Sequence, residues 1–481
     1  MNRKLFINLT GWISATLLFC TCSNVEDAIR CDREICLFPD YPETVIPYNI
    51  CPLNFRIDTE GDAFRVRFVA GTDSFEVRSS GNVNIPLKKW KRLLENHPGE
   101  YLVMKFFVRS GSTVRQYRDK HLLIAAEPLD PYLVYRLIEP GYELWAKMGI
   151  YQRCLENFEE KPVLLNVQTE RNCINCHSFR RNRPEDMLFH LRTTYGGSVL
   201  VKNGKARKVD TKSPDEISAG VYPRWHPDGR YVAFSVNATH QSFHAANENV
   251  LEVYDKESDI ILFDTETGRK LTDTVIHRAD RFETHPEWSS DGRFLYFCSA
   301  MARTMPQQYD SLRYDLLRVA FDPATGRFGT TIDTLLSSEC LKKSAAFPRI
   351  SPDGKFLAVC LTTYGTFPIW HHDNDLYLLN LQTGELSPLQ AINSDASDSY
   401  HSWSSNGRWM VFSSRRIGGL YTRPFIAYFD RQGHFHSPFL LPQKNPEYYD
   451  FLMKSYNVPE LIVGKIKLSS RTFERVAKRG S

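Results

Sequence analysis

Apolar and polar residues alternate along two segments in the first third of the chain, at residues 64–69 and 101–108. A period of two is typical of half-buried antiparallel strands, because successive side chains point to opposite faces of a sheet. The pattern predicts a mainly β chain that begins with a β-sandwich-like domain over residues 37–135. Near residues 87–96, Trp90, Leu93 and Leu94 share one face of a predicted short helix.

Apolar residues between positions 141 and 158 follow a different spacing. They recur at intervals of three and four, at Trp145, Met148, Tyr151, Leu155 and Phe158. This spacing predicts an amphipathic helix within a short helical linker over residues 136–186. Its apolar face is expected either to cover a flat apolar cofactor or to pack on a neighbouring domain.

Beyond residue 195 one sequence pattern occurs four times. Its copies start at Tyr222, His285, Phe347 and Tyr400, which are 63, 62 and 53 residues apart. Each copy holds an aromatic-rich strand, an Asp-Gly or Asn-Gly turn and a second apolar strand, which together are typical of a β-hairpin. Further apolar strands follow three of the hairpins, at 259–264, 315–319 and 375–379. Four strands per repeat predict the blades of a β-propeller.

These copies resemble the WD40-like repeats of TolB-like β-propellers, whose hallmark is the pattern Pro-x-Trp-Ser-Pro-Asp-Gly-x-x-Ile-Ala-Phe. The resemblance covers residues 221–442 and implies blades around a central channel, typically six in such relatives. A weaker copy at 187–210 and a closing strand within 459–468 extend the set. The sequence therefore predicts a five- or six-bladed propeller over residues 187–468 and a C-terminal tail at 469–481.

The first residues resemble an export signal. Arg3 and Lys4 precede an apolar run over residues 5–19 that is too short to span a membrane as a helix. Residues 17–23 resemble a bacterial lipoprotein signal, so we expect a signal segment at 1–22, a lipid on Cys22 and a tether at 23–36. A plain cleaved signal is the alternative. Both place the protein in the cell envelope, in the periplasm or at the outer membrane.

The most specific chemical motif is Cys173-Ile174-Asn175-Cys176-His177, of the form C-x-x-C-H. Two such thiols can bond the vinyl groups of a haem, and the adjacent imidazole can bind its iron. The motif predicts haem c held by Cys173, Cys176 and His177, with Met187 and His190 as candidates for the sixth ligand. A disulfide or redox pair, or a structural or metal-binding role, are the alternatives.

The order of these segments, from export signal through C-x-x-C-H to propeller, is similar to a group of exported Bacteroidetes-type propeller proteins often labelled cytochrome c biosynthesis proteins. That resemblance implies only Cys173, Cys176 and His177 as haem residues. Three further features are candidates for other roles. Cys31, Cys36 and Cys51 are close enough in sequence to supply one disulfide, and His285 and His401 are expected to line a binding funnel. The cluster 371–375 resembles a metal site but is better explained as a polar loop before a strand.

Composition and motifs limit the function classes. The formal charge is +4 in 481 residues, which gives no basic excess for binding nucleic acid. The chain contains no G-x-S-x-G, H-E-x-x-H or Gly-rich phosphate loop, which disfavours hydrolases. We expect a lipid-anchored protein whose propeller channel face binds an envelope protein and whose haem serves electron transfer or sensing. The alternatives are a haem-free propeller scaffold and a redox or carbohydrate-processing enzyme.

Overall fold

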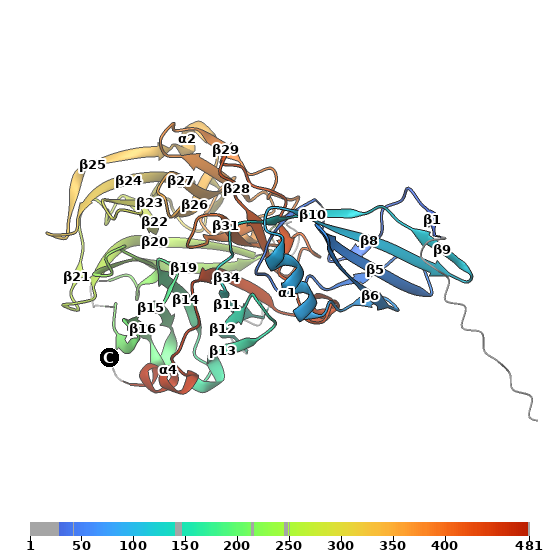
Figure 1. Cartoon of the computed structure of the whole chain (residues 1–481). Helices are drawn as coiled ribbons and strands as arrows, with labels where there is room; N and C mark the ends of the chain where they lie inside the picture. The colour runs from blue at the N-terminus through green and yellow to red at the C-terminus, as the bar shows by residue number, and fades with distance from the viewer. Residues whose placement is uncertain are drawn as a thin grey trace, which may run out of the picture.

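The computed structural model describes residues 28–41, 43–139, 147–212, 216–244, 249 and 251–479. Strands dominate these ranges. Figure 1 shows an N-terminal group of strands, in blue, beside a larger ring of sheets formed by the rest of the chain. The expected signal segment, the lipid site at Cys22 and the start of the tether lie outside the described residues.

Two sheets form the N-terminal part. The larger has seven strands, with β8 (Tyr101–Ser110) between β5 on one side and β9 and β10 on the other. Its remaining strands are β1 (Ile29–Arg30), β3 (Val45–Pro47), β5 (Ala63–Ala70), β6 (Asp73–Ser79), β9 (Thr113–Gln116) and β10 (Lys120–Ala125). The smaller sheet joins β2 (Leu37–Phe38), β4 (Phe55–Ile57) and β7 (Asn82–Val83). The alternating segments are thus strands, and β1 enters the sheet before the predicted boundary at residue 37.

Helix α1 (Leu87–Asn96) lies where the apolar spacing predicts it. Its buried residues are Trp90, Leu93 and Leu94. The indole Nε1 of Trp90 donates a hydrogen bond to the carbonyl oxygen of Ile50 at 3.0 Å, so the largest side chain of the helix is buried without an unpaired polar atom. Figure 1 shows α1 near the junction of the two parts.

The ring consists of six four-stranded sheets. We number them as blades 1 to 6 and give each from its innermost strand outward. Blade 1 contains β14 (Ile174–Arg180), β15 (Arg183–Leu191), β16 (Gly197–Lys202) and β17 (Lys205–Val209); blade 2 contains β18 (Val221–Trp225), β19 (Tyr231–Phe243), β20 (Leu251–Asp264) and β21 (Lys270–Leu271). Blade 3 contains β22 (Arg281–Trp288), β23 (Phe294–Met301), β24 (Asp315–Asp322) and β25 (Arg327–Leu336); blade 4 contains β26 (Ser344–Ile350), β27 (Phe356–Thr362), β28 (Asp375–Asn380) and β29 (Leu386–Pro388). Blade 5 contains β30 (Asp398–Trp403), β31 (Trp409–Ser414), β32 (Arg423–Tyr428) and β33 (Phe439–Leu440); blade 6 contains β34 (Ser455–Ile462), β11 (Tyr132–Ile138), β12 (Gly149–Cys154) and β13 (Glu160–Leu165).

Blade 6 closes the ring by joining two distant segments of the chain. Its innermost strand β34 pairs antiparallel with β11, and Tyr132 lies opposite Ile462. Each innermost strand contacts the innermost strand of the next blade, and β34 contacts β14. The ring is therefore a closed β-propeller of six blades, and the closing strand begins earlier than the predicted segment 459–468.

The helical linker predicted over residues 136–186 is wrong. Residues 149–154 form β12, which pairs with β11 on one side and β13 on the other. Five of its six residues are buried, so the strand has no polar face and its sequence shows no alternation. Of the residues with three-and-four spacing, only Tyr151 lies in β12, where it is the one half-buried residue, so the spacing does not mark a helix face. The propeller begins at residue 132 instead of 187. Residues 140–146 of the expected helix lie outside the described residues.

The C-terminal segment is also more ordered than predicted. It contains α4 (Ser470–Ala477), which packs on β13, β16 and β17. The side-chain oxygen of Ser469 accepts a hydrogen bond from the backbone nitrogen of Thr472 at 3.2 Å and so caps the helix. Phe473 is fully buried, with its ring 5.5 Å from that of Phe189. The remaining helices, α2 (Ser338–Leu341) and α3 (Tyr448–Phe451), are single turns.

A single cluster of buried apolar side chains extends from the N-terminal sheets into blades 4, 5 and 6. Among the described residues all nine cysteines are free, so the disulfide expected within Cys31, Cys36 and Cys51 does not form. Within the same ranges, the helices are too short or too polar to cross a membrane.

Candidate functional site

Every innermost strand carries the same irregularity at its midpoint. One residue per blade has a positive φ between 48° and 50°, and the pairing with the second strand shifts register there. These residues are Cys176, Tyr222, His285, Phe347, Tyr400 and Val458. A shift of this kind is a β-bulge, which turns adjacent side chains toward the same region. The six bulges therefore direct side chains into the central channel.

In blade 1 the bulge lies within the C-x-x-C-H motif, at its second cysteine, Cys176. Cys176 occupies the position of Tyr400, and His177 occupies that of His401, which is a proline in the other four blades. Ser178 and Phe179 then match Ser402 and Trp403. The sequence contained the signal for this equivalence, because Cys-His-Ser-Phe parallels Tyr-His-Ser-Trp at 400–403.

Aromatic side chains at the bulges fill the middle of the channel. The ring of His285 stacks on that of Phe347 with centroids 4.0 Å apart, and Tyr222 lies 4.8 Å from His285. Tyr400 lies 5.0 Å from Phe347 on its other side. The expectation that His285 and His401 line one funnel is therefore not met. His285 is part of the aromatic layer, whereas His401 is buried and its Nε2 lies 3.0 Å from the carbonyl oxygen of Ala358.

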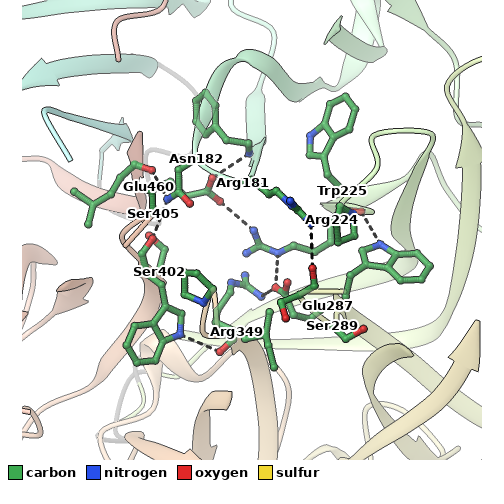
Figure 2. A pocket seen from close by; sticks show the side chains of 18 of the residues that line it. Arg181, Asn182, Arg224, Trp225, Glu287, Ser289, Arg349, Ser402, Ser405 and Glu460 are labelled. Atoms are coloured by element: carbon green, nitrogen blue, oxygen red, sulfur yellow. Dashed lines mark hydrogen bonds and ion pairs between the residues drawn. The ribbon is translucent and has the colours of Figure 1, made fainter. Parts of the chain in front are cut away.

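A pocket of about 450 Å³ lies on the side of this layer where the innermost strands end. Its floor is made by the residue two positions after the bulge in blades 2 to 6, and four of these are charged: Arg224, Glu287, Arg349 and Glu460. Figure 2 shows the four side chains converging on the centre of the pocket from four different blades. The volume falls within the range of about 300–1,000 Å³ that is usual for ligand sites.

The charged floor is held by three ion pairs. Arg224 contacts Glu287 at 3.3 Å and Glu460 at 3.2 Å, and Arg349 contacts Glu287 at 3.4 Å. The four side chains are only 8% to 14% exposed. Removing one member of such a buried pair leaves an uncompensated charge and typically costs about 3–5 kcal/mol. The floor is thus rigid and electrically balanced.

Burial shifts the titration of Glu287, Glu460 and Arg349 toward their neutral forms. It raises the pKa of Glu287 and of Glu460, and the neighbouring Arg224 opposes both shifts. Burial, followed by repulsion from Arg224, lowers the pKa of Arg349 to about 9. The floor thus contains two guanidinium groups and two carboxyl groups in contact with one another, so it has no excess of basic or acidic side chains.

The hairpin turn of blade 1 lies across the mouth of the pocket. Arg181 donates from Nη2 to the carbonyl oxygen of Ser290 in blade 3 at 3.2 Å. Asn182 donates from Nδ2 to the carbonyl oxygens of Trp403 and Leu461, at 2.9 and 2.8 Å, in blades 5 and 6. One turn therefore ties three other blades together at the rim, as Figure 2 shows for Arg181 and Asn182.

Polar atoms of the pocket remain available to a ligand. Among the described residues, Arg349 Nε and Ser402 Oγ are buried and have no hydrogen-bond partner, and both residues line the pocket. A buried polar atom without a partner costs about 1–3 kcal/mol, which a bound acceptor or water would recover. The sequence analysis does not identify these four charged residues as a site. A signal is present, because each of them follows the proline that comes directly after the bulge and precedes the repeated Trp or the apolar residue at its position.

The geometry around the C-x-x-C-H motif does not fit a haem. Cys173 packs in an apolar cluster between blades 6 and 1, whereas Cys176 and His177 line a cavity of about 60 Å³ inside the channel. Both thiols would have to reach one edge of a porphyrin, and the cavity is far below the size of a ligand site of about 300 Å³ or more. We therefore derive no chemistry through haem.

The candidates for the sixth ligand lie away from this cavity. Met187 is on β15 and belongs to the same apolar cluster as Cys173. His190 is on the same strand, and its Nδ1 lies 3.2 Å from Ser198 Oγ. Neither residue lines the cavity beside His177. The structure thus separates the residues that the haem prediction brings together.

The polar cluster at 371–375 is a structural network. His371 Nε2 lies 3.0 Å from Glu252 Oε1, and Asp373 accepts hydrogen bonds from Thr362 and Thr363. Glu252 and His371 are only 2% and 1% exposed. Within the described ranges no group of three or more His, Cys, Asp or Glu residues could hold a metal ion. The polar-loop interpretation is the one that the contacts support.

No family model and no curated protein matches the chain. Among solved structures it is similar to a puromycin-hydrolysing peptidase of Mycobacterium tuberculosis, with 12% identity and a TM-score of 0.38 over 72% of this chain and 52% of that one. It is also similar to prolyl oligopeptidase B from Galerina marginata, with 9% identity and a TM-score of 0.36 over 70% and 42%. A DUF4784 family protein from Bacteroides caccae matches with 8% identity and a TM-score of 0.31 over 76% and 97%. The chain spans about half the length of the first two, and similarity at this level carries no inference about activity.

Proposed function

We propose that this protein is a haem-free propeller scaffold of the cell envelope that binds a segment of another envelope protein in the pocket at the channel mouth. A lipid on Cys22 would hold it at the membrane, as its N-terminal sequence predicts. Membership of the TolB-like group remains a prediction from the repeats.

The observation that carries this proposal is the pocket of about 450 Å³ with its rigid, charge-balanced floor. Arg349 Nε and Ser402 Oγ supply buried hydrogen-bonding capacity that the described residues leave unused. The aromatic layer below gives the pocket a closed end, so a ligand enters from one side only. Such a site suits a short protruding segment of a partner better than a flat protein surface.

Haem attachment for electron transfer is the other function predicted from the sequence. The different surroundings of Cys173 and Cys176 and the cavity of about 60 Å³ favour the haem-free scaffold over it. Protein made in a host that attaches haem c should be colourless and have the intact mass of the polypeptide and its lipid. A reduced c-type spectrum that survives denaturation would reverse the preference.

The pocket is tested by blocking it without removing a charge. Ser402→Phe would place a ring over the floor, whereas Ser402→Ala removes only the unpartnered hydroxyl. A photo-crosslinking side chain at Asp291, on the rim, should capture an envelope protein in cells, and the Phe variant should lose that product. The Ala variant should retain it, with affinity reduced by about tenfold at most for one hydrogen bond.

The control places the same crosslinker at Lys205, on the outermost strand of blade 1, which should give no specific product. Both Ser402 variants are first checked for an unchanged unfolding midpoint, because a distorted ring would lose binding for a trivial reason. A crosslink that persists in folded Ser402→Phe protein would place the partner elsewhere on the propeller.

A further inference from the structure

The small cavity inside the channel is lined by positively charged groups. Arg136, Arg224 and Arg349 all reach it, together with Asn175, Cys176 and His177. None of the described residues that line it is Asp or Glu. Arg224 and Arg349 are neutralised by their ion pairs with the glutamates of the floor, so Arg136 supplies the uncompensated charge.

Arg136 is a buried guanidinium without a carboxylate partner. It comes from β11 and is 9% exposed. Nη1 donates to the side-chain oxygen of Asn175 and lies 3.4 Å from the carbonyl oxygen of Ile174. Its Nε is buried without a partner, and it forms no ion pair with any described residue. Buried charges are normally paired, because an isolated one loses its hydration without compensation.

Arg153, the other buried arginine of blade 6, differs from Arg136 in its hydrogen bonds. Arg153 is also buried and also lacks a carboxylate, but its three side-chain nitrogens donate to Cys154, Gln443 and Pro442. Its hydrogen-bonding capacity is therefore used by the protein itself. Arg136, in contrast, has an Nε without a partner among the described residues and lines a cavity.

Two more unpartnered polar atoms belong to residues that line this cavity. His177 Nε2 and Asn457 Oδ1 are buried and have no partner among the described residues. Burial, followed by the charges of Arg136 and Arg224, lowers the pKa of His177 to about 3. The hydrogen-bond donors that a bound anion needs come from Arg136, whose Nε has no partner among the described residues.

We propose that this cavity binds one small oxyanion, of the size of sulfate or phosphate, held by the N–H groups of Arg136 in a space that His177 and Asn457 also line. A planar guanidinium presents its N–H groups in a fork that matches two oxygens of such an anion. About 60 Å³ is enough for such an ion or a few waters and too little for a larger organic anion. Asn175, Cys176 and His177 of the C-x-x-C-H motif then form one wall of an anion site.

The anion would also join the strands that close the ring. Arg136 lies on β11, His177 on β14 and Asn457 on β34, and these belong to blades 6 and 1. Binding to the folded state alone raises stability with ligand concentration. Binding of the anion would therefore stabilise the closed ring.

The test uses the full chain and sulfate, which does not titrate near neutral pH. Isothermal titration should give one saturable site, and millimolar sulfate should raise the thermal midpoint more than sodium chloride of equal ionic strength. Arg136→Gln should weaken sulfate binding by about tenfold or more and remove the midpoint shift, since a charge-assisted hydrogen bond is lost. Phosphate should compete with sulfate.

Two further variants keep the result interpretable. Arg136→Lys retains the charge without the fork, and it should bind sulfate more weakly than the wild type but still measurably. Arg431→Gln removes an exposed charge far from the cavity and should leave sulfate binding unchanged. The proposal is overturned if wild-type protein shows no saturable sulfate site, or if a folded Arg136→Gln or Arg136→Lys variant binds sulfate as the wild type does. None of these variants touches the pocket at the channel mouth, so the outcome is independent of the proposed partner site.

Discussion

Glu283, near the start of the innermost strand of blade 3, is a single residue whose ionisation should be visible in the stability of the whole protein. It is fully buried, its Oε1 accepts a hydrogen bond from Ser299 Oγ at 3.4 Å, and Oε2 has no partner among the described residues. Burial and the nearby carboxylate of Asp259 raise the pKa of Glu283 from 4.5 to about 8, against the opposing charge of Arg281.

Between these two pKa values the folded protein holds a proton that the unfolded chain has released. Raising the pH therefore favours the unfolded state, and the free energy of unfolding should fall from about pH 5 to about pH 8. Each unit of pKa shift corresponds to about 1.4 kcal/mol. Glu283→Gln should flatten this slope and be more stable than the wild type near pH 8 by up to a few kcal/mol.

Urea unfolding of both proteins across this pH range measures the effect. His277 and Asp315 also lie near this cluster, through Asp259 and Arg281 respectively, and contribute the same background to both proteins. Parallel stability profiles for the two proteins would show that Glu283 is ionised in the folded state.

At the scale of residues, the spacing of Cys173, Cys176 and His177 marks them as a chemical motif, but it does not predict which side chains surround them. The motif was interpreted as a separate chemical unit because its three reactive side chains lie within five residues. The structure places the second half of the motif at a bulge that recurs in every blade, which determines where Cys176 and His177 point. That relation depends on strand pairing, which a local motif does not encode. The charges of Arg224, Glu287, Arg349 and Glu460 meet only when the ring closes.

The hairpin elements were the most predictable part of the fold. Gly229, Gly292, Gly354 and Gly407 have φ values between 65° and 82°, as the Asp-Gly and Asn-Gly turns predict. The repeat pattern does not reveal the blade segment at 132–165, because its strands lack the repeated turn and because β11 and β12 are buried along most of their length.

Two of the glycines separate backbone strain from steric contact. Gly292 and Gly384 both have φ of 75°. A Cβ at Gly292 would lie 2.3 Å from His226 Nε2, whereas a Cβ at Gly384 meets no atom within 4 Å. Gly384→Ala should cost about 1–2 kcal/mol for the left-handed conformation alone. Gly292→Ala should cost about 1–3 kcal/mol more, since His226 must move and its hydrogen bond to the carbonyl oxygen of Gly292 is disturbed.

Chemical denaturation of the two single variants measures the difference. Equal losses of stability would mean that His226 moves without cost, and the tight contact between blades 2 and 3 at this turn would then be unimportant for stability.

For the whole molecule, the closed ring predicts an asymmetric response to shortening the C-terminus. Deleting residues 455–481 removes β34, whose Tyr456, Leu461 and Ile462 are fully buried, and leaves β11 with an unpaired edge. The shortened protein should lose cooperative unfolding and aggregate. Deleting only residues 470–481 removes α4 and the buried Phe473, so it should cost a few kcal/mol and preserve the ring.

Size-exclusion chromatography and thermal unfolding compare the two deletions. A soluble, cooperatively folded protein without β34 would show that the other five blades hold the ring together, and the described closure would not limit stability.

The pairing of β11 with β34 also has a consequence for biogenesis. Tyr132 of β11 pairs with Ile462 of β34, so β11, β12 and β13 emerge long before the strand that pairs with β11. Contacts between positions so far apart in sequence form slowly. If the chain is exported unfolded, nearly its entire length must cross the membrane before the ring can close. During that interval the exposed edge of β11 is open to pairing with other chains, and a periplasmic chaperone that binds extended strands would protect it.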